Sequence, residues 1–231
     1  MKKLSLIFVA LFIVACGKKK KDLIVKANIE GLKKGTVYLK KAHDTILITV
    51  DSLVINGNSS FELSSDLESP EIFFLDLDKK STEKDRIKFF ADKGVIEINT
   101  TLKNFVFDAK IKGSKQQEIL EEYQSMISKM NNRDLELIKE QFEAQKRGDT
   151  AKLNMLLKEA NNSLKKKYLY TVNFALNHKD SEVAPYLALS EIYNAQVKYL
   201  DTINNSLTPQ VKNSKYGKEL EKFIKNIKEN E

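Results

Sequence analysis

The sequence contains one cysteine, Cys16, and no tryptophan among its 231 residues. A single cysteine excludes a disulfide within the chain, a Cys-x-x-C redox pair and a metal site built from several thiolates. Glycoside hydrolysis by paired carboxylates needs a cleft, which usually carries aromatic platforms, so the lack of tryptophan argues against this class. Thiol redox chemistry is therefore ruled out, and sugar hydrolysis is disfavoured.

Histidine is almost as scarce, with only His43 and His178 in the chain. His43 stands beside Asp44 between two expected strands, and His178 stands at an expected helix end, where a cation favours the helix dipole. The sequence also lacks a glycine-rich phosphate loop, an HExxH motif and a GxSxG elbow. We therefore expect no catalytic residue, no metal and no cofactor.

Two groups of acidic residues are candidate sites. The first group has oxygen ligands at alternate positions, an arrangement that suits Ca²⁺. However, lysines interrupt this group, and the glycine that an EF-hand loop needs is missing. These two features favour a solvated loop. The second alternates with basic residues and is typical of a helix face with pairs three or four apart. These groups are Asp76, Asp78, Ser81, Glu83 and Asp85, and Asp134, Glu136, Glu140 and Glu143.

The only long apolar run extends from Leu4 to Ala15, behind Lys2 and Lys3. It is too short to span a bilayer, which needs about 20 residues, but it suits the core of a secretory signal. Its end resembles a bacterial lipobox, which implies cleavage before Cys16 and lipidation of that residue. An ordinary signal peptide or membrane anchor with an incidental cysteine is the alternative. The lipobox residues are Ile13, Val14, Ala15 and Cys16.

A basic tether over residues 16–22 separates this signal from the first expected strand. Its four lysines are expected to bind an anionic leaflet, so that the acyl chain and the basic tether together anchor the protein. The alternative is that the lysines only keep a linker soluble. Lys18 follows Gly17 where an aspartate commonly retains lipoproteins in the inner membrane, which favours the outer membrane, facing the periplasm. The lysines are Lys18, Lys19, Lys20 and Lys21.

The formal net charge of +7 comes from an excess of lysine rather than arginine, and it falls to +5 without Lys2 and Lys3. Arginine is the usual residue for bidentate phosphate recognition. We therefore interpret the charge as solvated surface and membrane attraction, and we expect no nucleic-acid partner.

Residues 23–112 alternate apolar and polar side chains with a period of two. The Asn56–Asn58 turn predicts a hairpin between the run ending at Ile55 and the strand Ser60–Leu63, and Phe105–Ile111 closes the set. Adjacent phenylalanines, at 73–74 and 89–90, place one ring on each sheet face, where coverage by helices is the simplest explanation. Short strands joined by polar turns predict an antiparallel β-sandwich or open barrel.

Residues 113–231 show the helical period instead. Ser114 and Gln117 have capping-box spacing, Gly148 ends the first helix, and Asp149 or Thr150 begins the next. A third helix is expected from Ser181 and a last one after Pro209. The chain is thus predicted to be α+β, with a strand-rich domain followed by a small bundle of about four helices.

Several stretches form a pattern of turn glycines and apolar positions: Ile29–Leu32, Val37–Leu39, Asp51, Ser52 and Val54, Asn58–Phe61, Phe90–Gly94, Ile111–Ser114, His178–Ala184 and Lys215–Leu220. This pattern resembles the family DUF4369, a domain of unknown function, over most of residues 23–228. The resemblance implies an exported lipoprotein of certain Gram-negative bacteria. Members of the family are often followed by a thioredoxin-like domain, which is missing here, so the resemblance implies no catalytic residue.

Three functions follow as expectations. The first is a non-catalytic envelope lipoprotein that reaches the membrane through its lipid and binds another envelope component or a ligand. The second is an accessory subunit of a separately encoded thioredoxin-like oxidoreductase. The third and least favoured is a hydrolase built on carboxylates, which requires two acidic side chains converging in a pocket.

Overall fold

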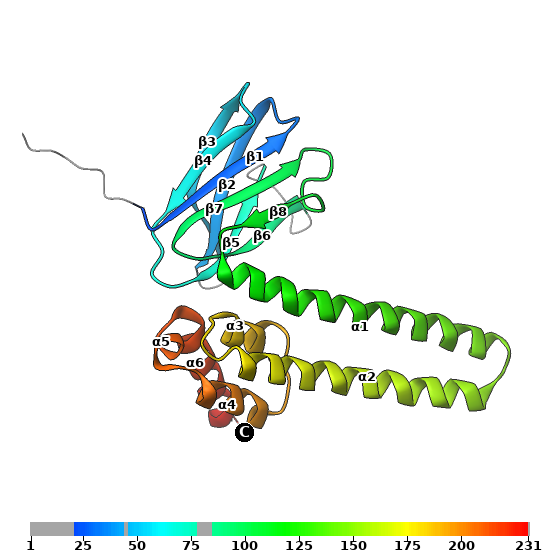
Figure 1. Ribbon diagram of the computed structural model, residues 1–231. Coiled ribbons are helices and arrows are strands. Elements are labelled where there is room, and N and C mark those ends of the chain that lie inside the picture. Colours follow the sequence, from blue (N-terminus) through cyan, green and yellow to red (C-terminus); the bar gives the residue numbers. More distant parts are fainter. Residues whose placement is uncertain (1–20, 44–45, 78–84, 231) are drawn as a thin grey trace, which may run out of the picture.

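The computed structural model describes residues 21–43, 46–77 and 85–230, which form a strand-rich half and a helical half (Figure 1). The fold is α+β, as predicted, with a sandwich of two four-stranded sheets and no closed barrel. The strands are β1 (Leu23–Glu30), β2 (Lys34–His43), β3 (Ile46–Asn56), β4 (Ser60–Ser65), β5 (Glu71–Asp76), β6 (Arg86–Ala91), β7 (Gly94–Thr101) and β8 (Lys110–Lys112).

The strand orders are β4-β1-β7-β8 in one sheet and β3-β2-β5-β6 in the other. The expectation of wholly antiparallel sheets is wrong, because β1 and β7 pair in parallel with Leu23 opposite Gly94. The chain leaves the first sheet after β4, builds β5 and β6 in the second, and returns beside β1. A turn-by-turn interpretation of the sequence does not reveal this return.

The predicted hairpin at Asn56–Asn58 is also wrong. Gly57 has the positive φ of 92° that its sequence context predicts, but β3 and β4 belong to different sheets. Phe61 and Leu63 of β4 are buried in the sandwich core, and β4 pairs with β1 rather than with β3. Turn chemistry therefore sets the local backbone here, while burial of β4 decides its partner.

The expected strand Phe105–Ile111 is reduced to β8, because residues 103–108 form turns. Thr100 donates its hydroxyl to the Phe105 carbonyl at 2.7 Å, and the Phe105 ring packs into the sandwich core. Phe105 is thus a buried turn residue rather than a strand residue.

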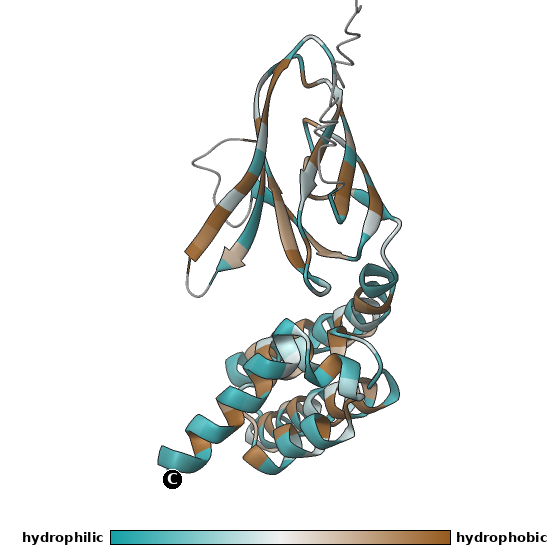
Figure 2. Ribbon diagram, turned by 90° about the vertical axis from the view of Figure 1, so that its left-hand side faces the viewer, coloured by the Kyte–Doolittle hydropathy of each residue, from teal (hydrophilic) through white to brown (hydrophobic). Residues whose placement is uncertain are grey.

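The period of two correctly identifies the two faces of the strands, which Figure 2 shows as alternating apolar and polar segments. Phe73 and Phe89 lie inside the sandwich. Ile72 and Phe90 point to the other face of the same sheet and pack with residues of the helices. Coverage of this face by the helices is thereby confirmed.

The helical half contains six helices, and two of them form a long antiparallel hairpin that extends beyond the sandwich (Figure 1). The cap at Ser114 is confirmed, since its hydroxyl accepts from the Gln117 N–H, and Asp149 caps the second helix. The third helix ends at Ser190, and an additional helix over Val197–Ser206 follows it, so the bundle has more helices than the expected four or so. The helices are α1 (Lys115–Lys146), α2 (Thr150–Asn177), α3 (Val183–Ser190), α4 (Val197–Ser206), α5 (Pro209–Lys212) and α6 (Lys215–Asn230).

Among the residues that the structure describes, no helix combines the length and apolar character needed to cross a bilayer.

Candidate functional site

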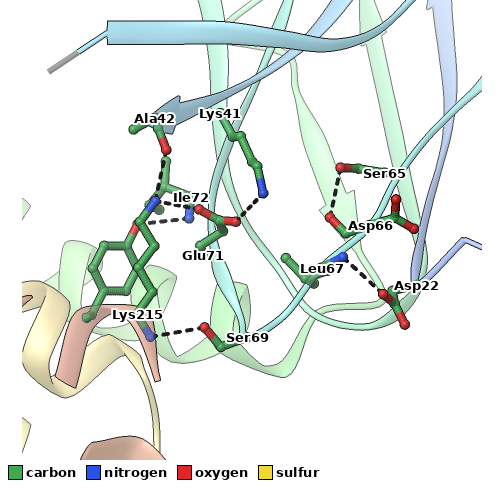
Figure 3. A network of polar contacts seen from close by, with 11 residues as sticks. Asp22, Lys41, Ala42, Ser65, Asp66, Leu67, Ser69, Glu71, Ile72 and Lys215 are labelled. Carbon is green, nitrogen blue, oxygen red and sulfur yellow. Dashed lines mark hydrogen bonds and ion pairs between the residues drawn. The ribbon is translucent and has the colours of Figure 1, made fainter. Parts of the chain in front are cut away.

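The sandwich and the helices meet at a polar junction where β2, β5 and the start of α6 come together (Figure 3). Glu71, the first residue of β5, is buried and accepts from Lys41 at 2.9 Å and from Lys215 at 2.5 Å. Lys215 also donates its ammonium group to the Ala42 carbonyl at 3.0 Å. One carboxylate thus joins two lysines that come from different halves of the fold.

Tyr216 seals the same junction from the helical side. Its hydroxyl accepts from the Ile72 N–H at 3.0 Å, and its ring packs against the edges of Phe90 and Tyr186. Burial raises the pKa of Tyr216 well above its usual value. The side chain is therefore a neutral hydrogen-bond partner for a backbone group of β5.

The residues before β5 extend this contact toward the start of the fold. Ser69 accepts from the Lys215 N–H at 3.1 Å, and two residues upstream the Leu67 N–H donates to Asp22 at 3.1 Å. Asp22 also accepts, through its carbonyl, from the Gly94 N–H at 2.8 Å. The β4–β5 connection is thus fixed both to the residue preceding β1 and to α6.

A surface cleft of about 490 Å³ opens beside the junction. Lysines and glutamates both line it, and Glu71 is engaged by two of the lysines, so the cleft is suited to a polar ligand that carries both charges. No group of three potential metal ligands occurs within the described ranges. The cleft is lined by Lys41, Ala42, His43, Glu68, Ser69, Glu71, Asn213, Lys215, Lys218 and Glu219.

The family model of DUF4369, a domain of unknown function, matches residues 23–120. Residues 23–120 form a DUF4369 domain. The match covers the eight strands described above and the first turns of α1, and it confirms the resemblance over residues 23–120. It does not reach the later stretches His178–Ala184 and Lys215–Leu220. No curated protein and no solved structure matches the chain.

The predicted lipidation signal precedes the DUF4369 domain. Residues 1–20 lie outside the described residues; they include the lipobox Ile13–Cys16 and Lys18–Lys20 of the tether. Lys21 is described, and its ammonium group lies 2.8 Å from Asp66 in an exposed ion pair. One tether lysine is therefore directed onto the domain surface.

The two histidines lie in separate places. His43 ends β2 and lines the cleft of the DUF4369 domain, while His178 caps α2 with its ring stacked on Phe174. His178 Nδ1 is 2.9 Å from the Phe174 carbonyl, and its Nε2 is 4.0 Å from Glu122. The structure does not bring the histidines together.

The acidic loop proposed from the sequence begins inside the DUF4369 core. Asp76 belongs to β5, is fully buried, and lies 2.6 Å from Lys40 and 3.6 Å from Arg86. The expectation of a solvated loop is therefore wrong for Asp76. Asp78, Ser81 and Glu83 lie outside the described residues, and Asp85 directly precedes β6.

The acidic run of α1 partly faces the other long helix rather than solvent alone. Arg133 contacts Glu136, as predicted, but it also reaches Glu159 of α2 at 2.8 Å. Burial by itself would raise the pKa of Asp134, but hydrogen bonds from Lys167 and Ser163 of α2 outweigh it and lower the pKa. These contacts hold the two helices together.

Sequence reasoning did not single out Glu71 or Lys41, since isolated charges in strands carry no motif. The stretch Lys215–Leu220 belongs to the resemblance noted in the sequence, beyond the family match over residues 23–120, and it is the sequence signal that falls at the junction. The first three residues of α6 each have a structural role at this point. Lys215 binds Glu71, and Tyr216 binds the Ile72 N–H. Gly217 leaves no room for a side chain, because a Cβ there would lie 2.1 Å from the Val211 carbonyl oxygen.

Proposed function

We propose that the chain is a non-catalytic lipoprotein of the cell envelope, anchored through a lipid on Cys16. The observation that carries this proposal is the apolar run that ends at the only cysteine, a few residues before the DUF4369 domain begins at Leu23. The favoured location is the outer membrane, with the protein facing the periplasm.

The position of Asp22 supports an anchor role for Cys16. Asp22 is bound to Leu67 and Gly94, and five residues separate it from Cys16. The six Cα–Cα steps from Cys16 to Asp22 span roughly 20 Å when fully extended. A lipid on Cys16 would therefore keep the folded part close to the headgroups.

Metabolic labelling with a fatty acid tests the anchor. The wild-type chain is expected to take up label and to fractionate with membranes, whereas Cys16→Ser takes up none. A matched control, Ser5→Ala, changes the signal outside the lipobox and keeps the label. Equal labelling of the wild type and Cys16→Ser would contradict the proposal.

We further propose that the folded part is a binding or accessory module and that the cleft at the junction is its binding surface. Affinity capture from envelope extracts tests this, with Lys218→Glu as the variant, because Lys218 lines the cleft outside the Glu71 ion pairs. A partner held by the wild type and lost with Lys218→Glu supports a binding module.

The nature of a captured partner separates the two versions of this module. Specific recovery of a thioredoxin-like oxidoreductase would assign the accessory role, and recovery of another envelope component would assign the general binding role. Equal capture by the wild type and Lys218→Glu would exclude the cleft as the binding surface.

A further inference from the structure

The hairpin of α1 and α2 has two chemically different faces. Leu137 and Leu156 are buried between the helices and mark the seam. Successive residues of an α-helix are rotated by about 100° about the helix axis. Residues that stand three positions after or four positions before Leu137 or Leu156 therefore lie on one and the same side of the seam. On that side Arg133 pairs with Glu159, and Lys152 lies 3.7 Å from Glu140.

The opposite face begins with the residue that follows each seam position. In antiparallel helices these two residues, Ile138 and Leu157, turn to the same side. Phe142 and Leu164 extend the stripe by one and two helical turns. The four side chains are strongly exposed, at 60% for Ile138, 56% for Phe142, 46% for Leu157 and 54% for Leu164.

Lysines border this apolar face on both outer edges of the hairpin. Helical spacing places Lys146 on the α1 edge and Lys158 and Lys165 on the α2 edge, and all three are exposed. The Lys146 ammonium group lies 4.8 Å from the centre of the Phe142 ring.

Within residues 131–169, all of which the structure describes, Asp134 is the one acidic residue of the two helices that turns toward the apolar side, and it is partly buried and paired with Lys167 of α2. Glu136, Glu140, Glu143 and Glu159 lie on the charged side, and Asp149 caps α2 in the connection between the helices. The asymmetry is therefore one of charge sign as well as of polarity.

We propose that this face of the hairpin binds the surface of an anionic lipid membrane. Apolar side chains at the centre and lysines at the borders match the acyl boundary and the anionic headgroups of such a surface. Neither long helix can cross the bilayer, so the hairpin binds in the plane of the interface.

A second copy of the chain fits this face less well. Two hairpins packed face to face would bring lysine borders against lysine borders, because the glutamates of both helices lie on the charged side and Asp134 is already paired with Lys167. Like charges in contact disfavour association. Charge complementarity therefore favours the lipid surface over self-association.

Vesicle co-sedimentation tests the proposal with an unacylated chain that starts at Gly17. This chain keeps every described element, and its binding is independent of Cys16, so the result is separate from that of the anchor experiment. Vesicles of phosphatidylglycerol mixed with phosphatidylcholine are expected to bind it, and vesicles of phosphatidylcholine alone are expected to bind at least tenfold less.

Two exposure-matched substitutions locate the binding face. Leu164→Ser and Met155→Ser alter side chains that are both 54% exposed, but Met155 precedes the seam residue Leu156 and lies on the charged side. Leu164→Ser is expected to weaken vesicle binding about five- to tenfold, and Met155→Ser is expected to leave it unchanged. Equal effects, or no binding of anionic vesicles, would overturn the proposal.

The lysine borders have a matched control as well. Lys146→Gln with Lys158→Gln removes one lysine from each border, whereas Lys129→Gln with Lys166→Gln removes two exposed lysines from the charged side. Only the first pair is expected to weaken binding, by about tenfold, and to reduce its dependence on salt. Concentration-dependent dimerisation that Leu164→Ser abolishes, without vesicle binding, would assign the face to self-association and overturn the proposal.

Discussion

Lys215, on the last helix, binds Glu71, on the fifth strand, at 2.5 Å although the two residues are 144 positions apart in the sequence. Lys41 binds the same carboxylate from β2 at 2.9 Å. A buried acid therefore joins the DUF4369 domain to α6, beside the hydrogen bonds of Tyr216 with Ile72 and of Lys215 with Ser69. We expect α6 to unfold together with the sandwich.

Replacing Glu71 with glutamine is expected to destabilise the protein by about 2 kcal/mol. The substitution keeps the side-chain volume but leaves two partly buried lysines without a counter-charge. Because these lysines are only partly buried, the loss in free energy of unfolding is smaller than for a fully buried unpaired charge. Equilibrium unfolding in urea measures the change. Glu62→Gln is the control, because its exposed pair with Lys26 at 3.4 Å is expected to contribute under about 0.5 kcal/mol. Equal losses would contradict the role of Glu71.

Raising the pH above about 10 is expected to destabilise the fold through its buried tyrosines. Burial raises the pKa of Tyr123 to about 12 from 10.0, and it raises the pKa of Tyr216 further. The unfolded chain therefore loses these protons first, so stability is complete below pH 10 and falls as the pH rises toward the folded pKa. Urea unfolding at a series of pH values between 9 and 12 measures this decline.

Tyr123→Phe provides the comparison for the alkaline transition. Tyr123 is paired with the Thr171 hydroxyl at 2.8 Å, and Thr171 also bonds the Lys167 carbonyl, so phenylalanine leaves that hydroxyl with a partner. The variant is expected to lose less stability than the wild type between pH 10 and 12. An unchanged pH dependence would show that Tyr123 does not contribute.

The sequence predicted those parts of the fold that depend on local chemistry. The alternation of Leu23, Val25, Ala27 and Ile29 identifies the inner face of β1, and Ser114 correctly marks the start of α1. Both signals arise within a few residues. The α+β class and the order of strands before helices followed from such signals.

The remaining features depend on contacts between distant residues. The parallel pairing of β1 with β7 and the separation of β3 from β4 arise from which apolar faces are buried together, and Asn56–Asn58 looks the same in either case. At the junction, Glu71 acquires its role only when Lys41 and Lys215 approach it from β2 and α6. A single sequence contains no local mark of such a meeting.

Gly113 connects the two halves through a close backbone approach. It has a φ of 93°, and a Cβ at this position would lie 2.3 Å from the Val95 carbonyl oxygen. Gly57 has nearly the same φ, 92°, with open space around it. The two glycines therefore separate the cost of backbone strain from that of a steric clash.

Gly57→Ala is expected to cost about 1 kcal/mol from the positive φ alone. Gly113→Ala is expected to cost at least about 3 kcal/mol, because the clash with Val95 must also be relieved by moving the start of α1. Thermal or urea unfolding of both variants measures the difference. Similar losses would mean that the approach to Val95 is not tight.

The most direct measurement for the lipoprotein account is mass spectrometry of the amino-terminal fragment of protein purified from membranes. The account predicts a chain that begins at Cys16 and carries the added mass of a diacylglyceryl group and a fatty acyl chain. A chain that retains Met1, or one in which Cys16 is unmodified, would contradict it.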